Sequence, residues 1–336
     1  MIHYIVRRLL LMIPTLLGVT IAVFLLCQFV PGGPVEQVIA RARAYSAAHG
    51  ASQKTISPEE VANIKAYFGF DKPIHVRYLV WLGNLMRGDM GNSYVYHMPV
   101  WNVIVSKMPI SLFFGLTSFV LSYLVSVPLG VVKAVKHHSA FDIATSTVVF
   151  AGYIIPGYAL GILLILFLGG GSYLSWFPIS GVVSDNFEEL PAFAKLLDFL
   201  HHLCLPMICY MIGEFAFLTQ LMKNSLLDEL NKDYLRTALV KGVSFRAAVW
   251  KHGFRNALIP LATGSAELFT VMFAGALLIE RVFDIDGMGL LFYNSIVGRD
   301  YNVVMGVIFM SSALAMLGRL FADILYVVFD PRIRFT

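Results

Sequence analysis

The residue types that carry enzyme chemistry occur in this chain, but not at the spacings that catalysis or metal binding requires. There is no Gly-Lys pair, so the G-x-x-x-x-G-K-[ST] loop that cradles nucleotide phosphates is missing. No H-E-x-x-H or G-x-S-x-G motif occurs. Cys27, Cys204 and Cys209 have neither zinc-site nor redox-pair spacing. We therefore expect no catalytic residue, no metal site and no cofactor in this chain.

Carboxylates inside apolar runs are the next candidates for functional residues. Glu214 and Glu267 each lie within such a run, and a charge at a bilayer centre costs at least about 2.5 to 3.5 kcal/mol. Residues that share the predicted helical face of Glu267 are small or β-branched, namely Gly264, Val271 and Gly275. Such a face either lines a translocation pathway or permits close helix packing, with the glutamate bonded to a neighbouring helix. Both interpretations stay open, and the same two apply to Glu214.

Two further groups of charges lie at the ends of apolar runs. Glu280, Asp284 and Asp286 follow the run that contains Glu267 and precede two glycines, so they are candidates for an outer gate or for a solvated turn. Arg319 and Asp323 are four residues apart on one predicted helix. This spacing predicts an ion pair between them, and we expect the two residues to be structural or to snorkel toward the membrane surface.

Composition places these residues in a membrane protein. The chain has 336 residues, of which 58% are hydrophobic and only 14% are charged, and its mean hydropathy is +0.73. A water-soluble fold of this size needs more polar surface. The net charge of +4 is small, and the basic residues are dispersed between apolar runs, so we expect no nucleic-acid partner.

Six apolar runs are long enough to cross a bilayer, which takes roughly 20 residues of helix. They cover about residues 9–30, 110–132, 143–168, 203–222, 257–280 and 303–329. An even number of spans puts both termini on one side. Basic residues flank the spans at Arg7, Arg8, Lys133 and Lys136, and several more lie within 223–255, which predicts that both termini are cytoplasmic. The first run is too long for a usual signal peptide, so we interpret it as an uncleaved anchor.

These spans divide the chain into three parts. Residues 1–108 hold the first span and an extracytoplasmic segment, residues 109–330 hold a core with the other five spans, and residues 331–336 form a cytoplasmic tail. Within the extracytoplasmic segment, Ser57 and Pro58 predict the start of a helix over 58–67. A second helix is predicted over about 74–86, with an aromatic and apolar face. That face suits either packing on the core or lying at the lipid headgroups. A further interpretation is a small extracytoplasmic lobe that helps to receive a partner or cargo.

The loop between the fourth and fifth spans contains two predicted short helices. Asn231 or Asp233 is expected to cap the first helix, which is about eight residues long and ends at Gly242. Ser244 is expected to cap a second helix that runs through Trp250 to about residue 256. Two capped helices between spans indicate a lever on which a cytoplasmic partner presses, rather than a solvated linker.

The residues of this loop resemble the EAA loop of ABC importer permeases, in their peptide/nickel branch. The match comprises residues 234–238, Gly242, and residues 255–260, which end in Pro260. Arg236 and Thr237 stand where the family has Glu and Ala. The resemblance implies that the first helix is a coupling helix that docks on an ATPase subunit. The residues implied in this coupling are Tyr234, Arg236, Thr237, Ala238, Lys241, Gly242 and Ser244.

Weaker matches extend the resemblance over nearly the whole chain. They include residues 69–73, 88–91, 126–130, 280–283, 299–301 and 330–334, all similar to dipeptide and oligopeptide permeases. Other short stretches resemble the first permease of oligopeptide importers that also admit the peptide-nucleotide microcin C. The resemblance implies an all-α, six-helix integral membrane protein with the type I ABC importer permease fold, in the bacterial inner membrane.

The resemblance also implies a set of partners. The chain would form half of a translocation pathway for peptides, with a second homologous permease, one or more ABC ATPase subunits and an extracytoplasmic peptide-binding protein. ATP and Mg²⁺ would bind in the ATPase, and membrane lipid would surround the spans. Nickel import occurs in the same family, but no histidine or cysteine cluster favours it here.

Two alternatives belong to other functional classes. A stand-alone secondary transporter would use Glu214, Glu267 and Asp323 as proton or cation sites, and it would show repeated halves with interrupted helices, which we do not find. A membrane-embedded enzyme such as a protease has no motif to support it. The capped helix that ends at Gly242 distinguishes an ABC importer permease from a stand-alone transporter, because a self-sufficient carrier does not need this helix.

Overall fold

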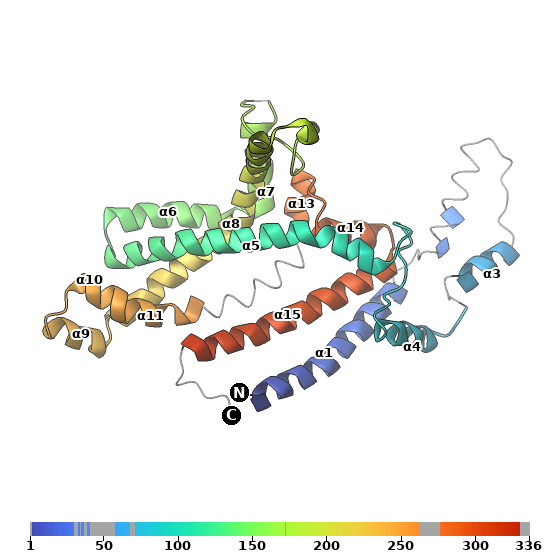
Figure 1. Cartoon of the computed structure of the whole chain (residues 1–336), viewed down its shortest axis with the longest axis horizontal. Coiled ribbons are helices and arrows are strands. Elements are labelled where there is room, and N and C mark those ends of the chain that lie inside the picture. The colour runs from blue at the N-terminus through green and yellow to red at the C-terminus, as the bar shows by residue number, and fades with distance from the viewer. Residues whose placement is uncertain are drawn as a thin grey trace. The chain divides into compact units, whose positions relative to one another are not determined.

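The computed structural model describes residues 2–29, 33, 35–36, 39–40, 58–67, 71–171, 173–261 and 276–329. Every regular element in these ranges is a helix (Figure 1). Four helices are long and apolar enough to cross a membrane, at His3–Phe29, Val100–Val135, Ala192–Leu230 and Tyr301–Ile324. They belong to α1 (Ile2–Phe29), α5 (Val100–Val135), α8 (Ala192–Leu230) and α15 (Tyr301–Phe329). The all-helical membrane fold is therefore confirmed.

The third predicted span is not one straight helix. It consists of α6 (Ala140–Ile154), α7 (Gly157–Leu164) and a π-helical turn, η1 (Ile165–Gly169). The two parts are bent by 96°. Pro156 causes the break, because it lacks an N–H and disfavours a helical conformation in the residue before it. Ile155 accordingly has φ −84° and ψ 117°, which is extended backbone.

Counting this bent pair as one span gives up to five spans in the part of the chain that the structure describes. The fifth predicted span, over 257–280, lies mostly outside the described residues. Its first residues continue α11 (Phe254–Ala257), and its last belong to α13 (Leu277–Phe283). The total of six spans therefore stays a prediction.

The helices form two compact units. The first comprises Met1–Arg8, Ile110–Leu290 and Leu314–Thr336. In this unit α6, α7 and α11 pack on α8, and α13 packs on α7. The part of α5 in this unit also meets α8 closely, because a Cβ on Gly130 would lie 2.6 Å from the Cβ of Met222. Unit 1 is thus built around α8.

The second unit comprises Leu9–Pro109 and Leu291–Ala313. Its core includes Phe24, Tyr301 and Met305, with Tyr78 and Trp81 packed against them. The carboxylate of Asp300 is fully buried and accepts hydrogen bonds from Ser93 Oγ (2.5 Å) and the Val95 backbone N–H (3.1 Å). These bonds join the loop before α5 to the start of α15. They explain why an acid stands at this position.

Both helices predicted between the first and second spans are present. They are α3 (Pro58–Tyr67) and α4 (Ile74–Leu85). On α4, Tyr78 stacks on Trp81, with ring centroids 6.3 Å apart, and its hydroxyl lies 3.0 Å from Thr20 Oγ1 of α1. The aromatic face of α4 therefore packs within its own unit, as the packing interpretation predicted. The remaining described elements are η2 (Phe187–Glu189) and α14 (Met288–Val297).

Candidate functional site

The loop after α8 folds into a first short helix, α9 (Asp233–Val240), which has the predicted length of eight residues. The predicted cap is wrong, because Lys232 occupies the N-cap position and no side chain caps the helix there. Asp233 lies in the first turn, where a negative charge favours the helix dipole. Asn231 Nδ2 donates to the Leu227 carbonyl instead, at the end of α8.

The end of α9 confirms the expectation for Gly242. This residue has φ +87°, a left-handed conformation that glycine adopts without a Cβ penalty. Its N–H donates to the Leu239 carbonyl (3.0 Å), and the Val243 N–H donates to the Ala238 carbonyl (3.1 Å). These bonds satisfy carbonyl groups at the helix end and turn the chain sharply toward the next helix.

The second short helix is also present. Ser244 caps it, as its Oγ accepts a hydrogen bond from the Ala247 N–H. Helical backbone then continues through α10 (Phe245–Ala248), the π-helical turn η3 (Val249–Gly253) and α11. The predicted extent, past Trp250 to about residue 256, is confirmed. We call residues 231–261 the α9–α11 segment.

The α9–α11 segment is anchored on α8 by several buried side chains. Leu235 of α9 is only 1% exposed. A Cβ on Gly253 would lie 3.1 Å from Leu235 Cδ1 and 3.4 Å from Leu226 Cδ1 of α8, so glycine permits this close approach. Val249 and Ala257 belong to the same buried cluster as Leu226. Displacement of α9 therefore acts directly on the end of α8.

A polar contact joins the same three elements at the surface. The Tyr234 hydroxyl of α9 donates a short hydrogen bond to a Glu229 carboxylate oxygen of α8. Asn256 Nδ2 of α11 donates to the Tyr234 hydroxyl at 3.1 Å. Burial, followed by the bond to the Glu229 carboxylate, raises the pKa of Tyr234 to about 12, so it stays a donor at neutral pH. Of the predicted coupling residues, Tyr234 is thus a positioning residue.

The outer face of the segment combines apolar and basic side chains. Val240, at the end of α9, is 88% exposed, and Leu239, Phe245 and Trp250 are also exposed large hydrophobic residues. The exposed cations Arg236 and Lys241 lie on the same helix and at its end. Thr237 Oγ1 donates to the Asp233 carbonyl within α9. A mixed apolar and basic patch of this kind suits a protein partner.

A buried ion cluster, which the sequence reasoning missed, links α8 to α5 and α6. Asp142 of α6 lies 2.8 Å from Lys223 Nζ of α8 and 3.3 Å from Lys133 Nζ of α5. Lys133 Nζ also donates to Thr145 Oγ1 and Ser146 Oγ. All three charged residues are buried. The available signal was that Lys133 and Lys223 directly follow two predicted spans and Asp142 directly precedes another, so all three lie at span ends.

The predicted pathway residues are only partly described. Glu214 lies in α8, is partly buried and acts electrostatically on Tyr123 of α5. Gly264, Glu267, Val271 and Gly275 lie outside the described residues. Their roles stay predictions.

The predicted gate residues have different environments. Glu280 is fully buried, and its carboxylate accepts from the Leu290 N–H (2.7 Å), the Ala276 N–H (3.2 Å) and Ser111 Oγ (3.3 Å). Asp284 is exposed, and its backbone has the left-handed conformation, with φ +52°. Asp286 is also exposed. Glu280 thus holds the turn after α13 together, and the structure does not bring its carboxylate to the surface with the two aspartates.

Asp323 has other partners than the predicted one. The Tyr4 hydroxyl donates to Asp323 Oδ2 at 2.8 Å, and Arg8 Nη2 lies 3.1 Å from the same oxygen. Both partners come from α1, whereas Arg319 was expected. The residues of α1 and α15 in unit 1 are therefore joined by an ion pair, which is a structural role as predicted.

Comparisons with known proteins agree with these observations. A family model described as the binding-protein-dependent transport system inner membrane component matches residues 126–335, and the model of its N-terminal region matches residues 1–115. The chain therefore belongs to this family, the permeases of ABC importers, and to its peptide-importing members.

Several relatives match over almost their whole length. The chain is 40% identical over 356 residues to the peptidoglycan transport system permease protein YejB of Agrobacterium fabrum, covering 99% of this chain and 98% of that protein. It is 41% identical over 358 residues to the inner membrane ABC transporter permease protein YejB of Escherichia coli O157:H7, with the same coverage. Identity to the oligopeptide transport system permease protein AppB of Bacillus subtilis is 35% over 336 residues, covering 100% of both.

Proposed function

We propose that this chain is the transmembrane permease of an ATP-driven oligopeptide importer and forms half of its translocation pathway. The observation that carries the proposal is the exposed patch of the α9–α11 segment. Val240 and the cations Arg236 and Lys241 lie on or next to a short helix that is anchored to α8 through Leu235. In this proposal both termini and the α9–α11 segment are cytoplasmic, and a cytoplasmic ATPase binds the patch.

The mechanism is alternating access. When ATP closes two ATPase domains, α9 moves with them and carries the end of α8 through Leu235 and the Tyr234–Glu229 hydrogen bond. The ion pair between Lys223 and Asp142 passes this displacement to α6. ATP and Mg²⁺ bind in the ATPase, and this chain carries out no covalent chemistry. Hydrolysis reverses the motion.

A complete importer requires further subunits. We infer a second homologous permease, one or more ATPase subunits and an extracytoplasmic peptide-binding protein. The relatives are named for peptidoglycan and oligopeptide transport. Cargo tests should therefore include oligopeptides, peptidoglycan-derived peptides and microcin C-like peptide-nucleotides. Glu214, Gly264, Glu267, Val271 and Gly275 are the residues to vary along the pathway, and Asp284 and Asp286 are those to vary at an outer gate.

Co-purification with the ATPase tests the proposal directly. The tagged chain is expressed with the neighbouring genes, and bound ATPase and peptide-stimulated ATP hydrolysis are measured for the wild type, Val240→Glu and Gly242→Asp. Val240→Glu puts a charge on the exposed patch without touching the core, so we expect bound ATPase to fall about tenfold or more. Gly242→Asp strains the left-handed turn after α9 and should reduce stimulation.

The control is Tyr173→Glu, which places the same acid at an exposed aromatic residue in the loop after η1. It should retain the ATPase. Equal retention by all variants would show that the patch is not the docking surface. Solute uptake by the purified chain alone in liposomes, without ATP, would instead support a secondary transporter that uses Glu214 and Glu267.

A further inference from the structure

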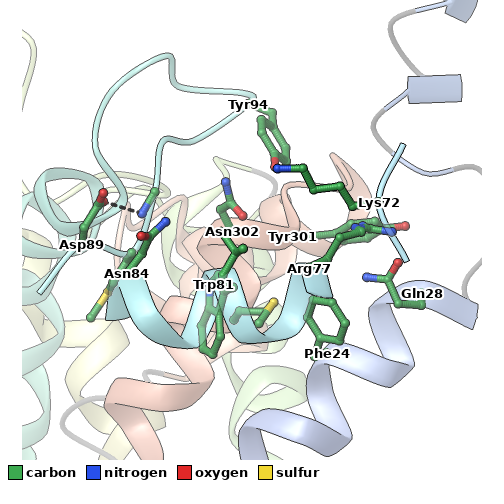
Figure 2. Close-up of a pocket in the computed structure, with 14 residues that line it drawn as sticks. Phe24, Gln28, Lys72, Arg77, Trp81, Asn84, Asp89, Tyr94, Tyr301 and Asn302 are labelled. Carbon is green, nitrogen blue, oxygen red and sulfur yellow. Dashed lines mark hydrogen bonds between the residues drawn. The ribbon is translucent and has the colours of Figure 1, made fainter. Parts of the chain in front are cut away.

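Unit 2 contains a pocket that the transport mechanism does not use. Its volume is about 230 Å³, and its walls come from the end of α1, from α4, from the loop after α4 and from the start of α15 (Figure 2). The loop wall is held in place, because Asn302 Nδ2 donates to the Asn92 carbonyl at 2.8 Å. Gly91, at φ +81°, lies so close to Asn302 that a Cβ there would be 3.1 Å from Nδ2. The pocket is therefore a built feature of the unit.

The charged residues that line the pocket are two cations, Lys72 and Arg77, and one carboxylate, Asp89. Figure 2 shows the cations at one end of the pocket and Asp89 at the other. Asp89 Oδ1 already accepts a hydrogen bond from the Gly91 N–H at 2.8 Å. The lining is thus net positive, and its positive end is separate from its carboxylate.

Arg77 is only partly exposed, and its guanidinium lies 6.0 Å from the centroid of the Phe24 ring. Burial lowers the pKa of Arg77 below its usual value. A guanidinium that has lost part of its hydration gains more from an anion than a fully solvated one does. Arg77 therefore makes this end of the pocket a favourable place for a negative group.

Two buried polar atoms in the pocket walls have no hydrogen-bond partner among the described residues. They are Trp81 Nε1 and the Tyr301 hydroxyl. Tyr301 is only 8% exposed, and Arg299, which can only donate, interacts with its hydroxyl oxygen and leaves the O–H hydrogen without an acceptor. Buried donors are normally satisfied, and an indole N–H can only donate. Both atoms have almost no solvent-exposed area, so they lie behind the side chains that line the pocket, and the two cations are the groups that face a ligand.

The position of the pocket on α1 indicates where this ligand comes from. Phe24 and Gln28 belong to the last turns of a helix of membrane-spanning length. Such an end lies at the depth of the lipid headgroups, where tryptophan, tyrosine and basic side chains gather. Exposed apolar side chains of α1 and α4 lie in the same elements, at Leu26, Phe29, Leu79 and Val80. This apolar surface suits acyl chains beside a bound headgroup.

We propose that the pocket binds the headgroup phosphate of an anionic membrane phospholipid. Lys72 and Arg77 bind the phosphate oxygens, and the acyl chains lie along the exposed apolar residues of α1 and α4. This lipid site is independent of the coupling surface at α9. Its role is to hold the end of α1, α4 and the start of α15 together at the membrane surface.

Native mass spectrometry of the full chain in mild detergent tests the site. Bound phosphatidylglycerol is measured for the wild type, the double variant Lys72→Gln/Arg77→Gln, and the control Arg87→Gln, which removes an exposed cation that does not line the pocket. Each basic residue near a lipid surface contributes on the order of fivefold to binding, so the double variant should bind about thirtyfold more weakly. The control should bind as the wild type does.

A second measurement identifies the source of the phosphate. Thermal stability is followed while phosphatidylglycerol, phosphatidylcholine or inorganic phosphate is added. We expect phosphatidylglycerol to stabilise the wild type most and inorganic phosphate to have no effect. Equal protection by inorganic phosphate, or equal lipid retention by the wild type and the double variant, would overturn the proposal.

Two milder variants decide the question if the double variant does not fold. Lys72→Gln alone changes an exposed side chain before α4, so the fold should be unaffected. Arg77→Gln alone removes the guanidinium and keeps a polar side chain at this position. Both should weaken phosphatidylglycerol binding severalfold, and unchanged binding in both would contradict the site.

Discussion

At the scale of single residues, Asp142 is the charge that matters most for the integrity of unit 1. Lys223 Nζ lies 2.8 Å from its carboxylate, whereas Lys133 also bonds Thr145 and Ser146. Asp142→Asn leaves both Lys223 and Lys133 buried without a counter-ion. We expect a loss of about 3 to 5 kcal/mol of stability, measured as a lower midpoint of thermal unfolding in detergent.

The same pair provides its own control. Adding Lys223→Met to Asp142→Asn removes one of the two unpaired charges and should recover part of the lost stability, because a buried pair replaced on both sides costs less than a pair that has lost one partner. No recovery in the double variant would show that Asp142 acts through some contact other than Lys223.

At the scale of elements, the bend between α6 and α7 depends on the residue that follows Pro156. A Cβ on Gly157 would lie 2.6 Å from the backbone oxygen of Cys209 in α8, and a backbone atom cannot move aside as a side chain can. Gly157→Ala should therefore destabilise the protein by about 1 to 3 kcal/mol. Gly213→Ala is the matched control in α8, because nothing lies within 4 Å of its Cβ position. The midpoint of thermal unfolding is measured for both variants. Equal midpoints would contradict the close contact at Gly157.

At the scale of the whole molecule, the orientation in the membrane is the property to test. Val240 and Tyr173 are both well exposed, and the predicted topology puts them on opposite sides. In a Cys204→Ala background, where Cys27 and Cys209 are buried, Tyr173→Cys should react with a membrane-impermeant maleimide in spheroplasts. Val240→Cys should react only after permeabilisation. The opposite pattern would invert the topology and remove the α9–α11 segment from the cytoplasm.

Local sequence determined the membrane-spanning helices and much of the α9–α11 segment. A span depends on a continuous apolar run, and a helix end depends on a few neighbouring residues such as Gly242 and Ser244, so both can be read along the chain. The start of α9 shows the limit, because Lys232 takes the cap position although Asn231 and Asp233 have better capping side chains. The bend at Pro156 was available from the sequence, but an apolar run alone conceals it.

Only the tertiary structure decided which charges meet. Asp323 bonds Tyr4 and Arg8 rather than its helical neighbour Arg319, and Asp142 bonds Lys223 across 81 residues of chain. Glu280 is likewise a buried acceptor for the turn after α13, where the sequence suggested a gate. A charge in an apolar environment takes whichever partner packing brings within reach, and that partner is set by how helices far apart in the sequence lie against one another.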